Sequence, residues 1–223
     1  NMIVNIYLLL LSASLCLAVP TNLLWPCKLG DYQCIGFILS RSSGCSPSVR
    51  GKLDSQYSVP SFRFEGPYFN TTYIDKNLTV RNHDKCYVAD FHLNTLTDKA
   101  LLVIDCPDLE LDSDRTLINH QSFLEDSEYT YHVCATYPLI RMTLTLDFAT
   151  KLDLCSTYVY TDVTAMPRFR VDPKDLKTKN YLSTDDSWQQ IFERENFFFR
   201  GYPLSRLFID AYLCYYGCPV TIL

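Results

Sequence analysis

Apolar and polar residues alternate along the middle of the chain, which is the pattern of strands with one buried face. Residues 87–93 place Asp90 and His92 between apolar side chains, and a polar turn near Leu96 leads into a second apolar run. We therefore expect residues 75–112 to form an antiparallel meander. The other segments with strand character are residues 140–148 and roughly 157–171, and a polar linker over 172–184 follows them.

Helical periodicity is found towards the two ends of the chain. Ile35, Ile38 and Leu39 share one face of a short helix, which the following Ser, Gly and Pro residues end. Apolar residues return at helical spacing over residues 187–215, after a capping-box pattern. Because proline cannot continue an uninterrupted helix, we expect a break or sharp kink near Gly201–Pro203. Residues 58–67, which contain two prolines, should form an extended connection.

Residues 1–18 have the apolar core and small-residue end of a signal peptide, with cleavage expected before Val19. Residues 19–223 contain no repeat or Gly/Ser linker, so we expect a single domain. The net charge is −5, and no cluster of Lys and Arg is present. This balance argues against binding to nucleic acid or to anionic membranes. Apart from the leader, no stretch is apolar enough to span a membrane.

Ten cysteines are present, and Cys16 leaves with the signal peptide, so an odd number remains. This density is typical of a secreted protein from an oxidising compartment. The glycosylation acceptors at Asn70 and Asn77 favour the same location. Cys86 and Cys106 flank one predicted hairpin, and we expect a disulfide between them.

The sequence offers little chemistry of the catalytic kind. The four histidines show no metal-ligand spacing, and no GxSxG, P-loop or GxGxxG pattern occurs. Cys214 and Cys218 have no second Cys/His pair nearby, so a disulfide is the simpler fate of Cys214. We predict that the protein is not an enzyme and has no metal site and no cofactor.

The segment Trp25–Cys34, with its Pro-Cys-Lys-Leu-Gly-Asp-x-x-Cys pattern, resembles the start of mature insect juvenile hormone-binding proteins and their takeout-like relatives. The resemblance implies an α+β fold with a short N-terminal helix and a long curved antiparallel sheet wrapped around a long C-terminal helix. It also implies disulfides Cys27–Cys34 and Cys155–Cys214, with Cys218 as a candidate free thiol. Subtraction alone then leaves Cys45 and Cys134 as a pair.

The same resemblance implies a carrier, secreted into the haemolymph, that holds juvenile hormone or a related isoprenoid in an internal hydrophobic tunnel. Tyrosine hydroxyls are the natural donors to a polar ligand group. The family tends to place such a donor near Tyr129, Tyr131 and Tyr137. The opening loop and the helix ends should meet, which gives as further pocket-lining candidates Trp25, Phe37, Ile38, Phe208, Tyr212 and Tyr215.

Two alternatives stay open. One is a general fatty-acid or odorant carrier. The other is a secreted, disulfide-stabilised interaction protein that has a filled core and acts on an unknown protein partner through its surface. For each aromatic candidate, ordinary packing in the sheet or core is the competing explanation.

Overall fold

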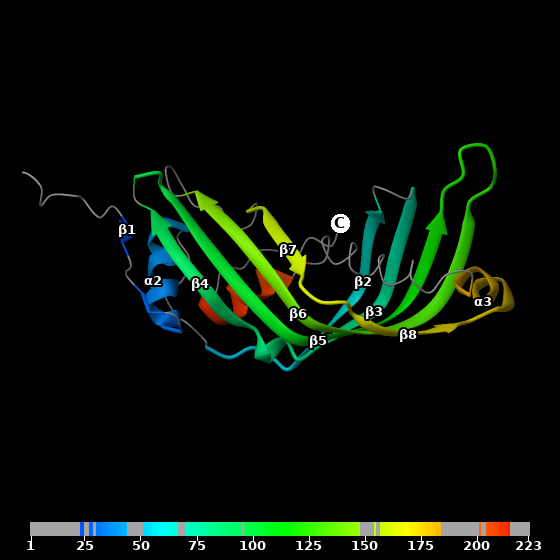
Figure 1. Ribbon diagram of the computed structural model, residues 1–223, viewed down its shortest axis with the longest axis horizontal. Coiled ribbons are helices and arrows are strands. Elements are labelled where there is room, and N and C mark those ends of the chain that lie inside the picture. The colour runs from blue at the N-terminus through cyan, green and yellow to red at the C-terminus, as the bar shows by residue number, and fades with distance from the viewer. Residues whose placement is uncertain are drawn as a thin grey trace, which may run out of the picture.

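The computed structural model describes residues 23–24, 27–28, 30–43, 51–66, 70–94, 96–147, 154, 157–183, 201 and 204–214. Its central feature is an antiparallel pair of 21-residue strands, β5 (Lys99–Asn119) and β6 (Ser127–Asp147). Both strands run the length of the molecule and bend near its middle, so that the sheet is curved (Figure 1).

The shorter strands add to this pair in two groups, and every pairing is antiparallel. We call the part of the sheet built on residues 99–105 and 140–147 the first half; its other strands are β1 (Leu23–Leu24), β4 (Tyr87–Asn94) and β7 (Val159–Val163). The second half is built on residues 109–119 and 127–137; its other strands are β2 (Gln56–Gly66), β3 (Thr71–Arg81) and β8 (Arg168–Pro173).

The two halves meet where β5 and β6 exchange neighbours. Between its pairing with β4 and its pairing with β3, β5 contains Pro107 and Asp108, and Asp108 has a positive φ of 48°. Pro138 lies in the corresponding interval of β6. Proline cannot donate to a strand ladder, so it is tolerated where the ladder is interrupted. The Asn82 side chain donates to the Asp108 carbonyl at 2.8 Å and joins the neighbouring segment to this point.

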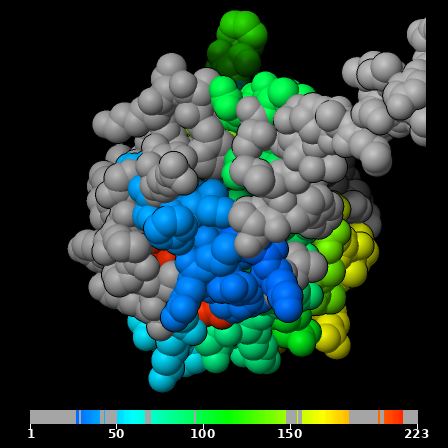
Figure 2. Space-filling view, turned by 90° about the vertical axis from the view of Figure 1, so that its left-hand side faces the viewer, coloured from blue at the N-terminus to red at the C-terminus, as the bar shows by residue number. Residues whose placement is uncertain are grey.

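Helices lie at both ends of the sheet. At the end of the first half, α2 (Tyr32–Ser43) lies beside helical residues 204–208, which continue into a π-helical turn, η3 (Ile209–Leu213). Figure 2 shows α2 on the surface of that end, with part of the C-terminal segment visible beside it. A short 3₁₀ helix, η2 (His83–Lys85), joins β3 to β4, and α3 (Leu176–Leu182) lies at the far end of the second half (Figure 1). Among the described residues, no helix has the length and hydrophobicity needed to cross a bilayer.

The two halves have different cores. In the first half, the fully buried side chains are mostly aliphatic; they include Leu102, Ile104, Ile140, Met142 and Leu144, with Phe208 from the C-terminal helix. In the second half, aromatic rings surround a buried ion pair. Arg115 Nε lies 2.7 Å from Asp75 Oδ1, and the exposed fractions of the two side chains are 3% and 0%. The hydroxyl of Ser113 also donates to Asp75.

The long antiparallel sheet and the short N-terminal helix were predicted, and the structure has both. Three local predictions need correction. The expected strand over 157–171 is two strands, β7 and β8. The polar linker over 172–184 contains α3, because the Asp175 side chain caps the helix by accepting from the Thr178 amide at 2.7 Å. The segment over 58–67 is extended as predicted, but it is not merely a connection: residues 58–66 belong to strand β2, in which Pro60 lies between the paired residues Val59 and Ser61.

A long C-terminal helix is not shown. Helical structure is described at residue 201 and over residues 204–213, and the last five of these are π-helical. Most of the proposed kink at Gly201–Pro203 lies outside the described residues. Gly201 itself packs against β7: a Cβ atom added there would lie 2.7 Å from Thr161 Cβ, closer than real Cβ atoms approach one another.

Candidate functional site

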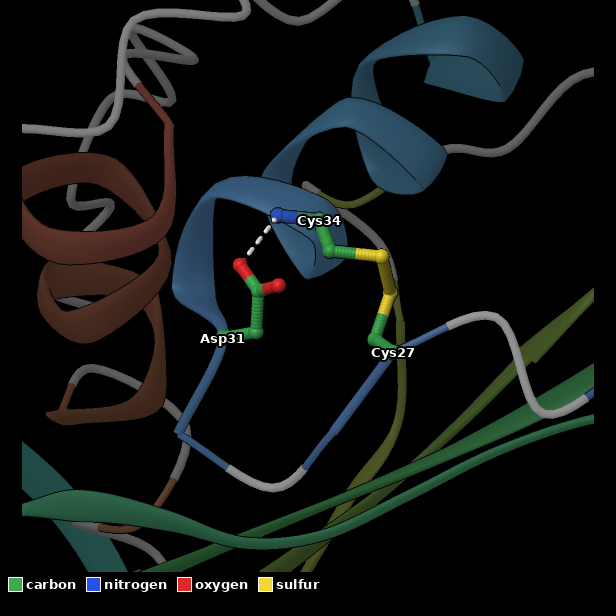
Figure 3. The surroundings of a disulfide bond; sticks show 3 residues. All are labelled: Cys27, Asp31 and Cys34. Carbon is green, nitrogen blue, oxygen red and sulfur yellow. Dashed lines mark hydrogen bonds between the residues drawn. A yellow bond between two sulfur atoms is a disulfide. The ribbon is translucent and has the colours of Figure 1, made fainter.

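The opening loop is fixed at the start of α2 by two interactions (Figure 3). Cys27 and Cys34 form the disulfide that the resemblance implied. Asp31 Oδ1 accepts from the Cys34 amide at 3.1 Å, which makes Asp31 the N-cap of the helix. Gly30 has a φ of 86°, a conformation that glycine adopts without strain. The bond and the cap together set the direction in which α2 leaves the loop.

Two of the pocket-lining candidates at this end, Phe208 and Tyr212, contact each other, and Tyr212 also contacts Tyr32. The ring of Tyr212 lies 4.7 Å from that of Tyr32 and 4.9 Å from that of Phe208. Burial, and then a hydrogen bond with Tyr32, raise the pKa of Tyr212 to about 12. Ile38 packs against the same core. Phe37, by contrast, is 58% exposed, and its assignment as a lining residue stays a prediction.

Trp25 and Tyr215 lie outside the described residues. Tyr32 was missed by sequence reasoning, although it directly precedes the predicted helix; its tyrosine partner lies far along the chain, and no local pattern connects the two.

The three tyrosines of β6 also have protein partners. Tyr129 stacks on Tyr181 of α3, with ring centroids 3.8 Å apart. Tyr131 is buried beside the Arg115 guanidinium, whose carbon lies 5.9 Å from its ring centroid. Tyr137 is fully buried in the core. Because α2 and α3 lie at opposite ends of the molecule (Figure 1), Tyr129, which stacks on α3, lies far from the Tyr212 group beside α2.

A different set of polar side chains gathers on β5 and β6 in the second half. We call Asp112, Asp114, His132 and Cys134 the thiol cluster. Cys134 Sγ lies 3.1 Å from Asp112 Oδ2 and 3.5 Å from His132 Nε2. His132 Nδ1 lies 3.2 Å from Asp114 Oδ1. Burial, and then the hydrogen bond with Asp112, raise the pKa of the Cys134 thiol.

The cysteine predictions can now be compared with the structure. Cys86 and Cys106 form a disulfide, as the hairpin geometry predicted. Cys134 is a free thiol, so its pairing with Cys45 by subtraction was wrong. Cys214 is disulfide-bonded, and its partner lies outside the described residues. The predictions for Cys45, Cys155 and Cys218 fall outside them too.

One hydrogen-bonded array has the order of a hydrolase triad. Thr72 Oγ1 lies 2.7 Å from His120 Nε2, and His120 Nδ1 lies 2.7 Å from Asp126 Oδ2. However, Thr72 is fully buried, and its hydroxyl also donates to Glu65, which lowers the pKa of that carboxyl. The array therefore ties the loop between β5 and β6 to β2 and β3, and it presents no accessible nucleophile.

Comparison with known proteins identifies the family. The chain matches the Fibroin P25 family over residues 23–218. The chain belongs to the Fibroin P25 family. It is also 47% identical over 209 residues to Fibrohexamerin from Galleria mellonella, a match that covers 93% of this chain and 96% of that protein.

Among solved structures, this Fibroin P25 protein is similar to Takeout 1 from Epiphyas postvittana. The two are 12% identical, the match covers 83% of this chain and 88% of the other, and the TM-score is 0.47. A likeness at this level carries no weight for function. The assignment to the juvenile hormone-binding family, made from the opening motif, is thus replaced by Fibroin P25.

The thiol cluster of this Fibroin P25 protein was invisible to motif reasoning. His132 and Cys134 are two residues apart, and Asp112 joins them only because it pairs with Cys134 across the two strands. A signal was present in the alternating pattern, since His132 and Cys134 occupy the polar positions of a strand. That pattern could not show that Asp112 lies beside Cys134, because the register of the β5–β6 pair was not known from the sequence.

Proposed function

We propose that this chain is a secreted, disulfide-stabilised interaction protein whose partner is fibroin. The observation that carries this proposal is the 47% identity to Fibrohexamerin over nearly the whole of both chains, together with the Fibroin P25 match. The name of the family refers to fibroin. The disulfides Cys27–Cys34 and Cys86–Cys106 support an oxidising, extracellular destination.

The packing of the described residues supports an interaction protein more than a carrier. Five of the aromatic side chains chosen as tunnel walls contact other protein rings or lie in the core: Tyr129, Tyr131, Tyr137, Phe208 and Tyr212. Candidate lining residues that are engaged with other protein side chains favour a function exercised at the surface.

The tip of the β5–β6 hairpin is the best-supported contact element. Phe123 is 99% exposed and Leu124 is 73% exposed, the two highest values among the exposed large hydrophobic residues of the described chain. The tip is held in place by the His120–Asp126 contact at its base. An aromatic side chain that a partner can bury is a typical interface anchor. We infer that this pair enters an apolar site on fibroin.

A carrier of juvenile hormone, of a related isoprenoid, or of a fatty acid or odorant is the competing function, and no described contact favours it. Location in the haemolymph, glycans at Asn70 and Asn77, and the absence of enzymatic activity stay predictions. Both asparagines are exposed, with φ of 49° and 53°.

Binding of the purified full chain to soluble fibroin from the same animal tests the proposal. We expect saturable capture that falls at least tenfold in Phe123→Ser/Leu124→Ser. The matched control is Leu176→Ser, which removes a residue that is 71% exposed at the start of α3 and should leave capture unchanged. Absence of fibroin capture, together with displaceable uptake of an apolar dye, would favour the carrier instead.

A further inference from the structure

Three side chains of the thiol cluster direct different donor atoms toward one point. Asp112 and Cys134 are directly opposite each other in the β5–β6 pair, and His132 precedes Cys134 by two positions, so all three lie on one face of the sheet. Their carboxylate, imidazole and thiol donors all lie within 4.8 Å of one another.

We propose that Asp112, His132 and Cys134 form a binding site for a divalent metal ion of the zinc type. Oxygen, nitrogen and sulfur donors at about 2.0, 2.1 and 2.3 Å from a tetrahedral zinc ion are separated from each other by about 3.3–3.6 Å. The separations here are 3.1 Å for Sγ to Asp112 Oδ2, 3.5 Å for Sγ to His132 Nε2, and 3.7 Å for Nε2 to Asp112 Oδ1. The thiol and the imidazole approach different oxygens of Asp112, so a rotation of this carboxylate is needed to bring one oxygen to the ion together with the other two donors.

The surroundings of His132 favour this role. Its Nδ1 lies 3.2 Å from Asp114 Oδ1, and its Nε2 lies 3.5 Å from Cys134 Sγ, so the tautomer that donates from Nδ1 to Asp114 offers the Nε2 lone pair to a metal ion. A carboxylate behind a metal-binding histidine fixes the ring and raises its basicity. Asp114 is itself held by Lys174 Nζ at 2.8 Å. Lys174, which directly follows β8, thus holds the Asp114 carboxylate in its position behind His132.

Two cations border the site and limit its affinity. Arg81 Nη1 lies 3.6 Å from Asp112 Oδ2, and the exposed Arg170 hydrogen-bonds the Cys134 side chain. Both compete with a metal ion for the same donors. With three protein ligands and partial exposure, the fourth position belongs to water. We therefore expect an open site, weaker than a closed structural zinc site. Metal binding here does not depend on whether the chain binds fibroin.

Titration of the full, disulfide-intact chain with cobalt(II) tests the site, because a cobalt–thiolate bond gives a near-ultraviolet charge-transfer band. We expect one equivalent to produce the band in the wild-type chain and Cys134→Ser to abolish it. Asp114→Asn should keep the band and weaken binding about 10- to 100-fold. His92→Gln is the matched control, since His92 also lies beside a carboxylate, at 2.6 Å from Asp90, but belongs to no such cluster.

Alkylation of the wild-type chain gives a second measurement that needs no variant to fold. Peptide mapping by mass spectrometry follows the modification of Cys134 alone. Zinc should slow that modification at least tenfold, and a chelator should restore it. A Cys134 alkylation rate that zinc leaves unchanged, or cobalt spectra that are identical for the wild type and Cys134→Ser, would overturn the proposal.

Discussion

The two halves of the sheet are stabilised by different interactions. The first half has an aliphatic core and is constrained by two disulfides: Cys27–Cys34 joins the opening loop to α2, and Cys86–Cys106 joins the residue before β4 to β5, next to the junction between the halves. The second half contains neither of these bonds, and its core surrounds the buried Asp75–Arg115 pair with aromatic rings.

This difference predicts that the two halves respond differently to mutations that change charge, packing or disulfide bonds. Apolar burial and disulfides tolerate changes in charge, and they depend on tight packing and on an oxidising environment. A buried ion pair depends on both of its members, because either one alone is an uncompensated charge. Mutations that act on one kind of interaction should therefore destabilise the two halves unequally.

The largest effect is expected from breaking the buried pair. Arg115→Met leaves Asp75 without its cation and should lower the free energy of unfolding by about 3–5 kcal/mol. Asp75→Asn should do the same, and the double variant should lose less than the sum of the two. Urea unfolding measures the loss, and hydrogen exchange should place it in β2 and β3. The exposed pair Lys99–Asp147 is the control: Asp147→Asn should cost less than about 1 kcal/mol. Single variants as stable as this control would contradict the comparison.

Removal of the Cys86–Cys106 bond should destabilise the first half. The bond joins residues 20 positions apart, and loss of a loop constraint of this size costs about 3 kcal/mol. Cys86→Ala/Cys106→Ala should therefore lower the denaturation midpoint and raise hydrogen exchange in β4 before β3. Faster exchange in β3 than in β4 would show that the two halves do not differ in this way.

His83 gives a pH test at the junction between the halves. Burial lowers the pKa of His83 to about 4, against an ordinary value of 6.5. Between these values the unfolded chain binds the proton more readily, so stability falls as the pH is lowered from about 6.5 to about 4. The shift corresponds to a loss of up to about 3 kcal/mol. Urea unfolding at several pH values should show this slope, and His83→Gln should flatten it. An equal slope in the variant would exclude His83 as its source.

The smallest effect is expected from adding one methyl group at Gly201, where the C-terminal helical segment contacts β7. Gly201→Ala would place its Cβ against Thr161, so we expect a loss of about 1–3 kcal/mol, measured by thermal unfolding. Thr161→Ala in the same chain should recover part of it. A Gly201→Ala variant as stable as the wild type would mean that this contact is not tight.

Alternation along single strands predicted much of the sheet, because side-chain period is a local property. It placed the hairpin closed by Cys86 and Cys106, and the N-terminal periodicity placed α2. Interactions between distant segments were not predictable. Asp75 and Arg115 are 40 positions apart, and the thiol cluster required the register of β5 and β6. The opening motif covers ten residues, which was too short a segment to distinguish the Fibroin P25 family from the family that it resembles.

Native mass spectrometry of the protein purified from its source tests the central claim most directly. The proposed function predicts a complex that contains this chain and fibroin, with no stoichiometric small apolar molecule retained by the chain. A chain that is released alone and carries one lipid or isoprenoid per molecule would contradict it and would restore the carrier hypothesis.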